Sequence, residues 1–184
     1  MQITHSHLLL DACCILNFCA SGNLLSILKS IPAEVVVTTI VQEHELQTLQ
    51  RLDDEDNEGA NQFEAAITQG LLKVVDFVSV EEEESFVNYA AILDDGESAT
   101  CAIAVHRNWV IATDDKKAIS FLKKEAPQIQ VLLTIEIIKY WSDKEGLDSS
   151  TLRDALSEIR IKGRYLPPKN HPLREWWETS SNNV

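Results

Sequence analysis

Acidic side chains gather at a helix start and just past a strand end between residues 93 and 115, in the stretch LDDGESATCAIAVHRNWVIATDD. An acidic turn that includes Glu97 opens an apolar helix, and the apolar segment 109–112 is soon followed by Asp114 and Asp115. Open α/β sheets bind ligands in the crevice beyond the carboxyl ends of their strands. We therefore expect these carboxylates to face a ligand rather than the core.

A second acidic strand end lies near the start of the chain, where the apolar run 8–10 stops at Asp11. A carboxylate directly after a buried strand is costly unless it is paired or coordinated. Glu43 and Glu45 supply further acids in the helix expected after a strand at 34–37. Mg²⁺ and Mn²⁺ prefer oxygen ligands, typically a few carboxylates with water and phosphate oxygens. The sequence therefore predicts a divalent metal site built from acids far apart along the chain.

Short apolar runs separated by helical segments predict a parallel sheet covered by helices. We expect strands at 8–10, 34–37, 71–78, 109–112 and 130–133. We expect helices at 12–19, 24–28, 40–52, 60–68, 80–93, 97–106, 116–124, 135–145 and 151–161. The charge run 53–58 is expected to be a solvated loop.

Two helix starts carry local signals. Ser79 and Glu82 have the spacing of a capping box, and Thr134 is expected to cap the helix that Gly146 ends. The four glutamates at 81–84 fall in the first turn of their helix, where the helix dipole favours acids. We therefore assign them no function.

Length and composition indicate an ordinary soluble protein. The 184 residues suffice for one domain with a full core. We recognise neither an apolar run near the ~20 residues of a membrane span nor a signal peptide. Three of the four cysteines crowd into 12–19 without a C-x-x-C pair. We therefore expect reduced thiols in the cytoplasm, with neither a zinc site nor disulfides.

The formal net charge of -13 argues against broad, nonspecific binding of nucleic acid, which depends on Lys and Arg. It leaves room for a nucleic-acid enzyme, because a bound metal cancels part of that charge at the site. It also leaves room for a basic protein partner.

The chain resembles the PIN-domain ribonucleases, which include the toxins of bacterial toxin–antitoxin pairs. The resemblance covers about residues 8–140 and rests on Leu9-Leu10-Asp11-Ala12-Cys13, Thr39 with Glu45-Leu46, Gly96-Glu97-Ser98-Ala99 and Thr113-Asp114-Asp115. It implies a three-layer α/β/α fold whose five-stranded parallel sheet has the order 3-2-1-4-5, with strands one and four adjacent. It also implies that Mg²⁺ or Mn²⁺ is held for RNA cleavage by Asp11, one of Glu43 and Glu45, Glu97, and one of Asp114 and Asp115.

Two positions of the pattern need a choice. Glu45 fits the Glu-Leu pattern of the family, whereas Glu43 fits an Ile-x-x-Glu spacing from Ile40, and we favour Glu45. Cys13 stands where the family often has Ser or Thr near the metal. Because a thiol is a poor ligand for Mg²⁺, Cys13 either weakens the metal site or packs in the core, and we favour packing.

We expect a PIN-like domain over residues 1–148 and a C-terminal appendage over 149–184, with a helix and a tail that contains proline and tryptophan. Tyr165 and the pair Trp176-Trp177 are suited to stack on bases or to dock on the domain, and we favour docking.

The predicted function is a metal-dependent ribonuclease, of endonuclease type, that hydrolyses RNA with a metal-activated water. Its predicted catalytic residues are Asp11, Glu45, Glu97 and Asp115. The resemblance further implies a homodimer and, for a toxin, an antitoxin partner. The competing prediction is a PIN-like binding or scaffold module with little activity that works through a protein partner. The acidic surface and Cys13 favour the module, whereas the full set of acidic positions favours the nuclease.

Overall fold

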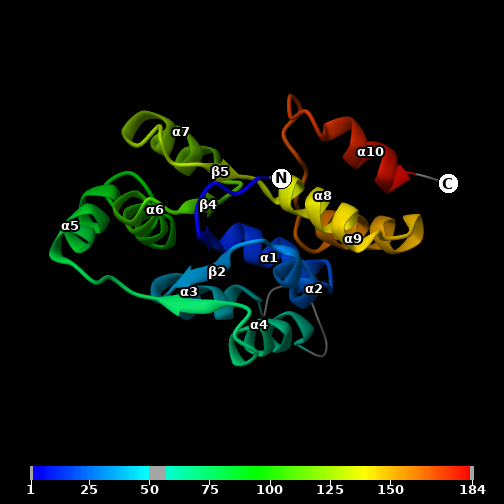
Figure 1. Cartoon of the computed structure of the whole chain (residues 1–184), viewed down its shortest axis with the longest axis horizontal. Coiled ribbons are helices and arrows are strands. Elements are labelled where there is room, and N and C mark those ends of the chain that lie inside the picture. Colours follow the sequence, from blue (N-terminus) through cyan, green and yellow to red (C-terminus); the bar gives the residue numbers. More distant parts are fainter. Residues whose placement is uncertain (1, 50–56, 183–184) are drawn as a thin grey trace.

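The computed structural model describes residues 2–49 and 57–182, without the side chains of residues 45–48 and 182. Within these residues, five strands form one parallel sheet in the order β3-β2-β1-β4-β5 (Figure 1). The strands are β1 (His7–Leu10), β2 (Glu34–Thr38), β3 (Lys73–Val75), β4 (Val110–Ala112) and β5 (Val131–Leu132). The predicted α/β fold class and the strand order are confirmed.

Helices connect the strands and cover the sheet. They are α1 (Ala12–Ala20), α2 (Leu24–Ser30), α3 (Thr39–Leu49), α4 (Glu58–Thr68), α5 (Val80–Tyr89), α6 (Asp95–Arg107), α7 (Lys116–Glu125), α8 (Thr134–Glu145), α9 (Ser149–Ile161) and α10 (Arg174–Asn182). In the described part of the chain, no single helix has the length and hydropathy to span a membrane. The helices α1 and α2 meet these criteria only together, as a pair bent by 119°.

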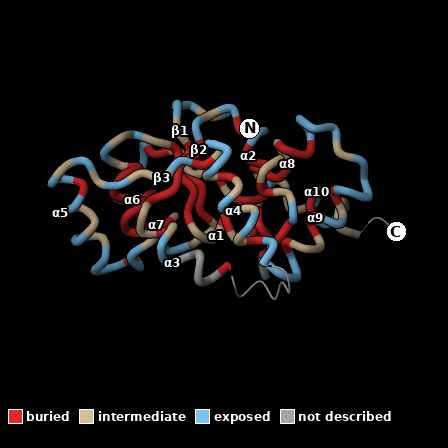
Figure 2. Tube along the Cα trace, turned by 90° about the horizontal axis from the view of Figure 1, so that it is seen from below, coloured by how far each residue is buried: buried red, intermediate tan, exposed pale blue. Residues whose placement is uncertain are grey.

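The strand β1 is apolar along its buried length because helices cover both of its faces. Alternate side chains of a strand point to opposite faces. Leu8 and Leu10 accordingly pack with residues of α1, α2, α8 and α9, whereas Leu9 packs with residues of α6 and α7. Figure 2 shows the buried interior along the strands and the exposed residues on the outer helices. The sheet is thus the middle of three layers.

Several element boundaries differ from the prediction. The helix predicted to reach residue 93 ends at Tyr89, after which the N–H groups of Ile92 and Leu93 both donate to the Tyr89 carbonyl in a turn. Thr134 begins α8 instead of capping it, and Leu133 is the cap residue. The strand predicted at 71–78 is shorter, and the helix α10 was not predicted.

Part of the predicted charged loop lies outside the described residues, as does the predicted end of the helix that precedes it. Of the run 53–58, residues 53–56 fall there, while Glu58 belongs to α4. The helix α3 is described as far as Leu49.

The C-terminal residues pack into the core that α1 forms with the sheet. Tyr165 and Trp177 are buried, and their rings meet edge to face with centroids 5.5 Å apart. At Gly163 the chain passes so close to α1 that a Cβ would lie 2.6 Å from Asn17 Oδ1 and 2.7 Å from the Ile159 carbonyl oxygen. Glycine is therefore required there by lack of space. The predicted domain boundary at residue 148 stays a prediction.

Glu82 lies in the first turn of α5, as predicted, and is buried there. The guanidinium of Arg107 donates to both carboxylate oxygens of Glu82, from Nε at 2.7 Å and from Nη2 at 2.9 Å. The Val78 N–H donates to the same carboxylate at 2.9 Å. Arg107 also lies over the ring of Trp109, 4.9 Å from its centroid. Glu82 therefore joins α5 to α6, because a buried carboxylate needs a paired charge.

We expect Arg107→Leu to destabilise the protein by about 3–5 kcal/mol, because it leaves the Glu82 carboxylate buried without a partner. The double variant Glu82→Leu/Arg107→Leu should lose clearly less, since no buried charge remains. Urea unfolding followed by circular dichroism measures both. The control is Glu83→Gln at an exposed neighbour, expected within about 0.5 kcal/mol of wild type. Equal losses in the single and double variants would assign the effect to packing.

Candidate active site

The adjacent strands β1 and β4 bring two distant segments together at the carboxyl edge of the sheet. Leu10 is in register with Ala112, so Asp11 and Thr113 follow on neighbouring strands. Thr113 Oγ1 donates to Asp11 Oδ2 at 2.6 Å. The hydroxyl oxygen of Thr113 also accepts a hydrogen bond from the Asp115 N–H at 3.1 Å. Thr113 thus positions one acid by its side chain and the other by its backbone.

Three acids at this edge are helix N-caps. Asp11 caps α1, Asp94 caps α6 and Asp115 caps α7. Oδ1 of Asp115 accepts from the N–H groups of Lys117 at 2.6 Å and Ala118 at 2.9 Å. These bonds do not use Oδ2 of Asp115, which stays available to a ligand. The positive ends of three helix dipoles therefore meet where the carboxylates gather.

Glu97 lies one turn into α6 and forms a capping box with Asp94. The Glu97 N–H donates to Asp94 Oδ1 at 2.8 Å, and the Asp94 N–H donates to Glu97 Oε2 at 3.4 Å. Capping boxes fix the side chains of both residues at a helix start. A local structural role and a position in the acidic group therefore coincide in Glu97.

These acids line one cavity of about 600 Å³. Its walls come from the starts of α1, α6 and α7 and from α3. The lining residues are Asp11, Ala12, Cys13, Leu16, Val41, His44, Asp94, Asp95, Gly96, Glu97, Asp114 and Asp115. The cavity thus combines six carboxylates with a thiol and an imidazole.

Burial and mutual repulsion shift the pKa values of two of these carboxyls toward neutrality. Burial raises the pKa of Asp11 to about 6, although hydrogen bonds from Thr113, Cys13 and the Ala12 N–H lower it. Burial, followed by the charges of Asp94, Asp115 and Asp11, raises the pKa of Glu97 to about 7. Negative charge is therefore costly here without a cation.

Asp114 faces a different set of partners. Its carboxylate accepts from Thr134 Oγ1 at 2.5 Å, from the Thr134 N–H at 3.0 Å and from Asn17 Nδ2 at 3.1 Å. Thr134, which was predicted to cap α8, is the first residue of that helix and binds Asp114 to the helix start. Burial raises the pKa of Asp114 against these bonds. The charge of Asp115, by contrast, contributes to the raised pKa of Glu97. This geometry favours Asp115 over Asp114 as the ligand.

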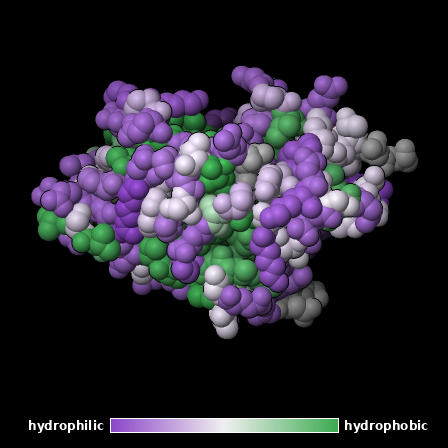
Figure 3. Space-filling model, in the orientation of Figure 1, coloured by the Kyte–Doolittle hydropathy of each residue, from purple (hydrophilic) through white to green (hydrophobic). Residues whose placement is uncertain are grey.

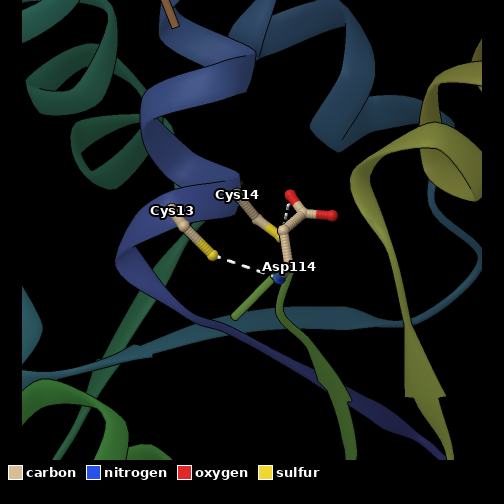
Figure 4. A group of neighbouring side chains, drawn as sticks. All are labelled: Cys13, Cys14 and Asp114. Carbon is tan, nitrogen blue, oxygen red and sulfur yellow. Dashed lines mark hydrogen bonds between the residues drawn. The ribbon is translucent and has the colours of Figure 1, made fainter. Parts of the chain in front are cut away.

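Cys13 packs against the core, as predicted, and it also lines the cavity. Its Sγ donates to Asp11 Oδ2 at 3.3 Å and accepts from the Asp114 N–H at 3.2 Å. Sγ of Cys14, the next residue, donates to Asp114 Oδ2 at 3.7 Å. Figure 4 shows both sulfur atoms directed from α1 toward Asp114. One sulfur atom, that of Cys13, therefore lines the cavity, and the sulfur of Cys14 is buried behind it.

The second acidic position of the pattern is only partly described. Glu43 is exposed on α3 and is not among the residues that line the cavity. Glu45 also lies on α3, but its side chain falls outside the described residues, so its role as a ligand stays a prediction. His44, which the sequence analysis did not consider, lines the cavity.

The hydrogen-bond partners of the carboxylates were not predicted from the sequence. Thr113 binds Asp11 and the backbone of Asp115, whereas Asn17 and Thr134 bind Asp114. A signal was present for Thr113, since it follows β4 directly, as Asp11 follows β1. No comparable signal existed for Asn17, because its partners lie more than 90 residues away along the chain.

A family model described as a PIN domain, DUF3368, matches residues 7–172. The chain belongs to the PIN-domain family. PIN domains are generally nucleases, and the matched span contains every acid of the cavity. No curated protein matches the chain.

The acids of this PIN domain fit a hard divalent ion. Asp11, Glu97 and Asp115 supply carboxylate oxygens, the donors that Mg²⁺ and Mn²⁺ prefer. Burial first and neighbouring carboxylates second raise the pKa values of Asp11 and Glu97, and a bound cation would stabilise their charged forms. The donor set of the cavity and the divalent metals typical of PIN domains therefore agree.

The metal-free PIN domain should lose stability as the pH rises. The folded-state pKa values of Asp11 and Glu97 are about 6 and about 7, above the ordinary values of 3.8 and 4.5. Their contribution is thus fully present below about pH 4 and is lost as the pH rises through 6 and 7. From pH 5 to pH 8, Asp11→Asn should gain about 1–2 kcal/mol in unfolding free energy relative to wild type.

Urea unfolding with a chelator present at the two pH values measures this gain. Asp154→Asn, at an exposed carboxylate on α9, is the control and should show no such trend. A gain for Asp11→Asn that does not depend on pH would contradict the assigned pKa shift.

The same substitution at two adjacent residues separates their roles. Asp114→Asn should cost about 1–3 kcal/mol, because an amide there leaves a donor of Asn17 or Thr134 unsatisfied. Asp115→Asn should change stability by less than about 0.5 kcal/mol, since Asn caps helices as well as Asp does. Urea unfolding without metal measures both. The reverse order of losses would contradict the assignment of Asp114 to structure.

Proposed function

We propose that this PIN domain is a metal-dependent ribonuclease that hydrolyses phosphodiester bonds of RNA. The observation that carries the proposal is the convergence of Asp11, Glu97 and Asp115 on one cavity at the carboxyl edge of the sheet. Carboxylates close together in a partly buried site repel one another, and a bound divalent cation relieves that repulsion. Membership of a family of nucleases supports the same reaction class.

Asp11, Glu97 and Asp115 would hold Mg²⁺ or Mn²⁺, with Glu45 of α3 as the further proposed ligand. When bound, such an ion activates a water and neutralises charge on the phosphate. Thr113 keeps Asp11 directed to the site, and the capping box keeps Glu97 in place. Bonds that the fold makes without metal thus orient two of the proposed ligands, Asp11 and Glu97.

Glu97 is also suited to orient the attacking water. It lines the cavity together with Asp94 and Asp115. Without metal its pKa is about 7, and a bound cation would lower that pKa. We propose that Glu97 is a metal ligand that also orients the attacking water.

Two lysines next to the cavity are proposed to bind RNA phosphates. Lys116 and Lys117 are exposed at the start of α7, next to Asp115. They are placed to meet phosphates on either side of a bond held at the acids. With a net charge of -13, such local contacts, rather than a broad basic surface, would position the RNA. Endonucleolytic cleavage is part of this proposal.

A second candidate function, a module that binds a protein partner, is favoured by a separate surface. Val78, Val80 and Val87 at α5 expose 78%, 63% and 67% of their surface. Hydrophobic atoms appear at this end of the molecule in Figure 3. Exposed apolar patches often mark interaction sites. An antitoxin, another protein and a second copy of the chain remain proposed partners for it.

The decisive experiment for the ribonuclease is Mn²⁺ binding by calorimetry together with cleavage of single-stranded RNA. Asp11→Asn keeps the shape of the side chain and removes its charge. We expect Asp11→Asn and Asp115→Asn to weaken Mn²⁺ affinity at least about tenfold and to reduce cleavage about a hundredfold. Glu43→Gln is the matched control, because Glu43 is exposed beside the cavity and does not line it.

Wild-type binding that Glu43→Gln retains and Asp11→Asn loses would support the site. An absence of Mn²⁺ binding by wild type would refute the nuclease and leave the partner-binding module. Binding without cleavage would separate a metal site from an enzyme.

A further inference from the structure

Behind the carboxylates of the cavity lies a second group of possible metal ligands with a different chemistry. The sulfur atoms of Cys13 and Cys14 and a carboxylate oxygen of Asp114 all lie within 4.8 Å of one another (Figure 4). Two of these donors come from the first turn of α1 and the third from the loop after β4. We propose that Cys13, Cys14 and Asp114 bind a thiophilic divalent ion of the zinc class.

The separations suit such an ion. Tetrahedral zinc has Zn–S distances of about 2.3 Å and Zn–O distances of about 2.0–2.2 Å, which place its ligands about 3.5–3.8 Å apart. Cys14 Sγ already lies 3.7 Å from Asp114 Oδ2. Side-chain movements of about 1 Å would bring in Cys13. The fold thus holds the three donors close to a coordinating geometry.

The present hydrogen bonds are of a kind that an ion can replace. Cys14 Sγ donates its proton to Asp114 Oδ2, and Cys13 Sγ donates to Asp11 Oδ2. On coordination each thiol loses its proton to solvent, and the ion takes the place of the S–H groups between sulfur and oxygen. The divalent ion then offsets two of the three negative charges carried by the two thiolates and the carboxylate.

An ion has a route to this site and a charge that attracts it. Cys13 and Asp114 both line the cavity, whereas Cys14 is buried behind them. The open side of the ion would face the cavity and accept a water. The neighbouring carboxylates of Asp11 and Glu97 raise the local concentration of cations.

Supporting residues fix the carboxylate and the buried thiol. Asn17 and Thr134 donate to Asp114, and Thr134 Oγ1 lies 3.4 Å from Cys14 Sγ. Such outer contacts orient ligands and tune affinity in metal sites. Asp114, which the geometry sets aside as a ligand for Mg²⁺, therefore has partners suited to a second metal.

Donor chemistry separates the two sites. Thiolates select zinc, cadmium and cobalt over magnesium, whereas carboxylates and water suit magnesium and manganese. The proposed thiophilic site does not depend on ribonuclease activity. The two sites touch where the Cys13 S–H donates a hydrogen bond to Asp11, and an ion bound by Cys13 would remove that hydrogen bond.

Titration of the reduced, untagged full chain with Co²⁺ tests the proposal by absorption spectroscopy. A thiolate ligand gives sulfur-to-cobalt charge transfer in the near ultraviolet, and a tetrahedral site gives intense visible bands. We expect the charge-transfer signal to correspond to one thiolate-bound Co²⁺ per chain, and Co²⁺ at the carboxylate site to give no such signal. Cys13→Ser and Cys14→Ser should each weaken Co²⁺ binding more than about tenfold and remove most of the charge-transfer absorption.

Two controls keep the outcome specific. Cys19→Ser replaces a buried thiol on the same helix and should leave the spectrum unchanged. Asp11→Asn removes a proposed Mg²⁺ ligand and should retain the charge-transfer band, which separates failure of this site from failure of the ribonuclease. If Cys14→Ser does not fold, Cys13→Ser carries the test, because Cys13 is partly exposed. Wild type without charge-transfer absorption, or a band that Cys13→Ser leaves intact, would overturn the proposal.

Discussion

The gathering of like-charged carboxylates at one edge of the sheet is the constraint on which this structure depends. Asp11, Asp94 and Asp115 each stand at the start of a different helix, where backbone N–H groups and the helix dipole favour negative charge. This support lowers the cost of the charges and does not remove it, as the raised pKa values of Asp11 and Glu97 show. The fold therefore stores unfavourable electrostatics in a cavity, the condition under which a divalent cation binds most favourably.

Thr113 and Asp114, in the loop after β4, bind different parts of the structure. Thr113 hydrogen-bonds Asp11 and the backbone of Asp115, so the two acids keep a fixed relation through one hydroxyl. Asp114 turns toward Asn17 and Thr134 and ties α1 to α8. The C-terminal segment packs beside this group of residues. Gly163 lies against Asn17, and Tyr165 is buried in the core. The family match, which extends to residue 172, includes this support.

Hard and soft donors meet along the first turn of α1. Asp11 offers oxygen to the cavity, and Cys13 and Cys14 offer sulfur beside it. A serine or threonine at the place of Cys13 would hydrogen-bond Asp11 as well, without a comparable affinity for zinc. The thiol pair thus lies directly beside the carboxylates of the cavity. The acidic cavity and the apolar valines of α5 lie on separate elements, so a protein partner at α5 and a substrate at the cavity would not compete for the same residues.

The sequence by itself determined the fold class, the strand order through its family resemblance, and the acids that follow β1 and β4. Those features depend on local patterns, since apolar runs mark buried strands and a charge directly after such a run marks the edge of a parallel sheet. Only the tertiary structure turned Asp114 toward Asn17 and Thr134, brought Cys13 into the cavity and paired Glu82 with Arg107. Each of these depends on partners brought close by the fold, such as Thr134, Thr113 and Arg107, which lie 20 to 102 residues away along the chain. Local pattern can place a carboxylate at a strand end, but the direction in which it points is set by neighbours that only folding supplies.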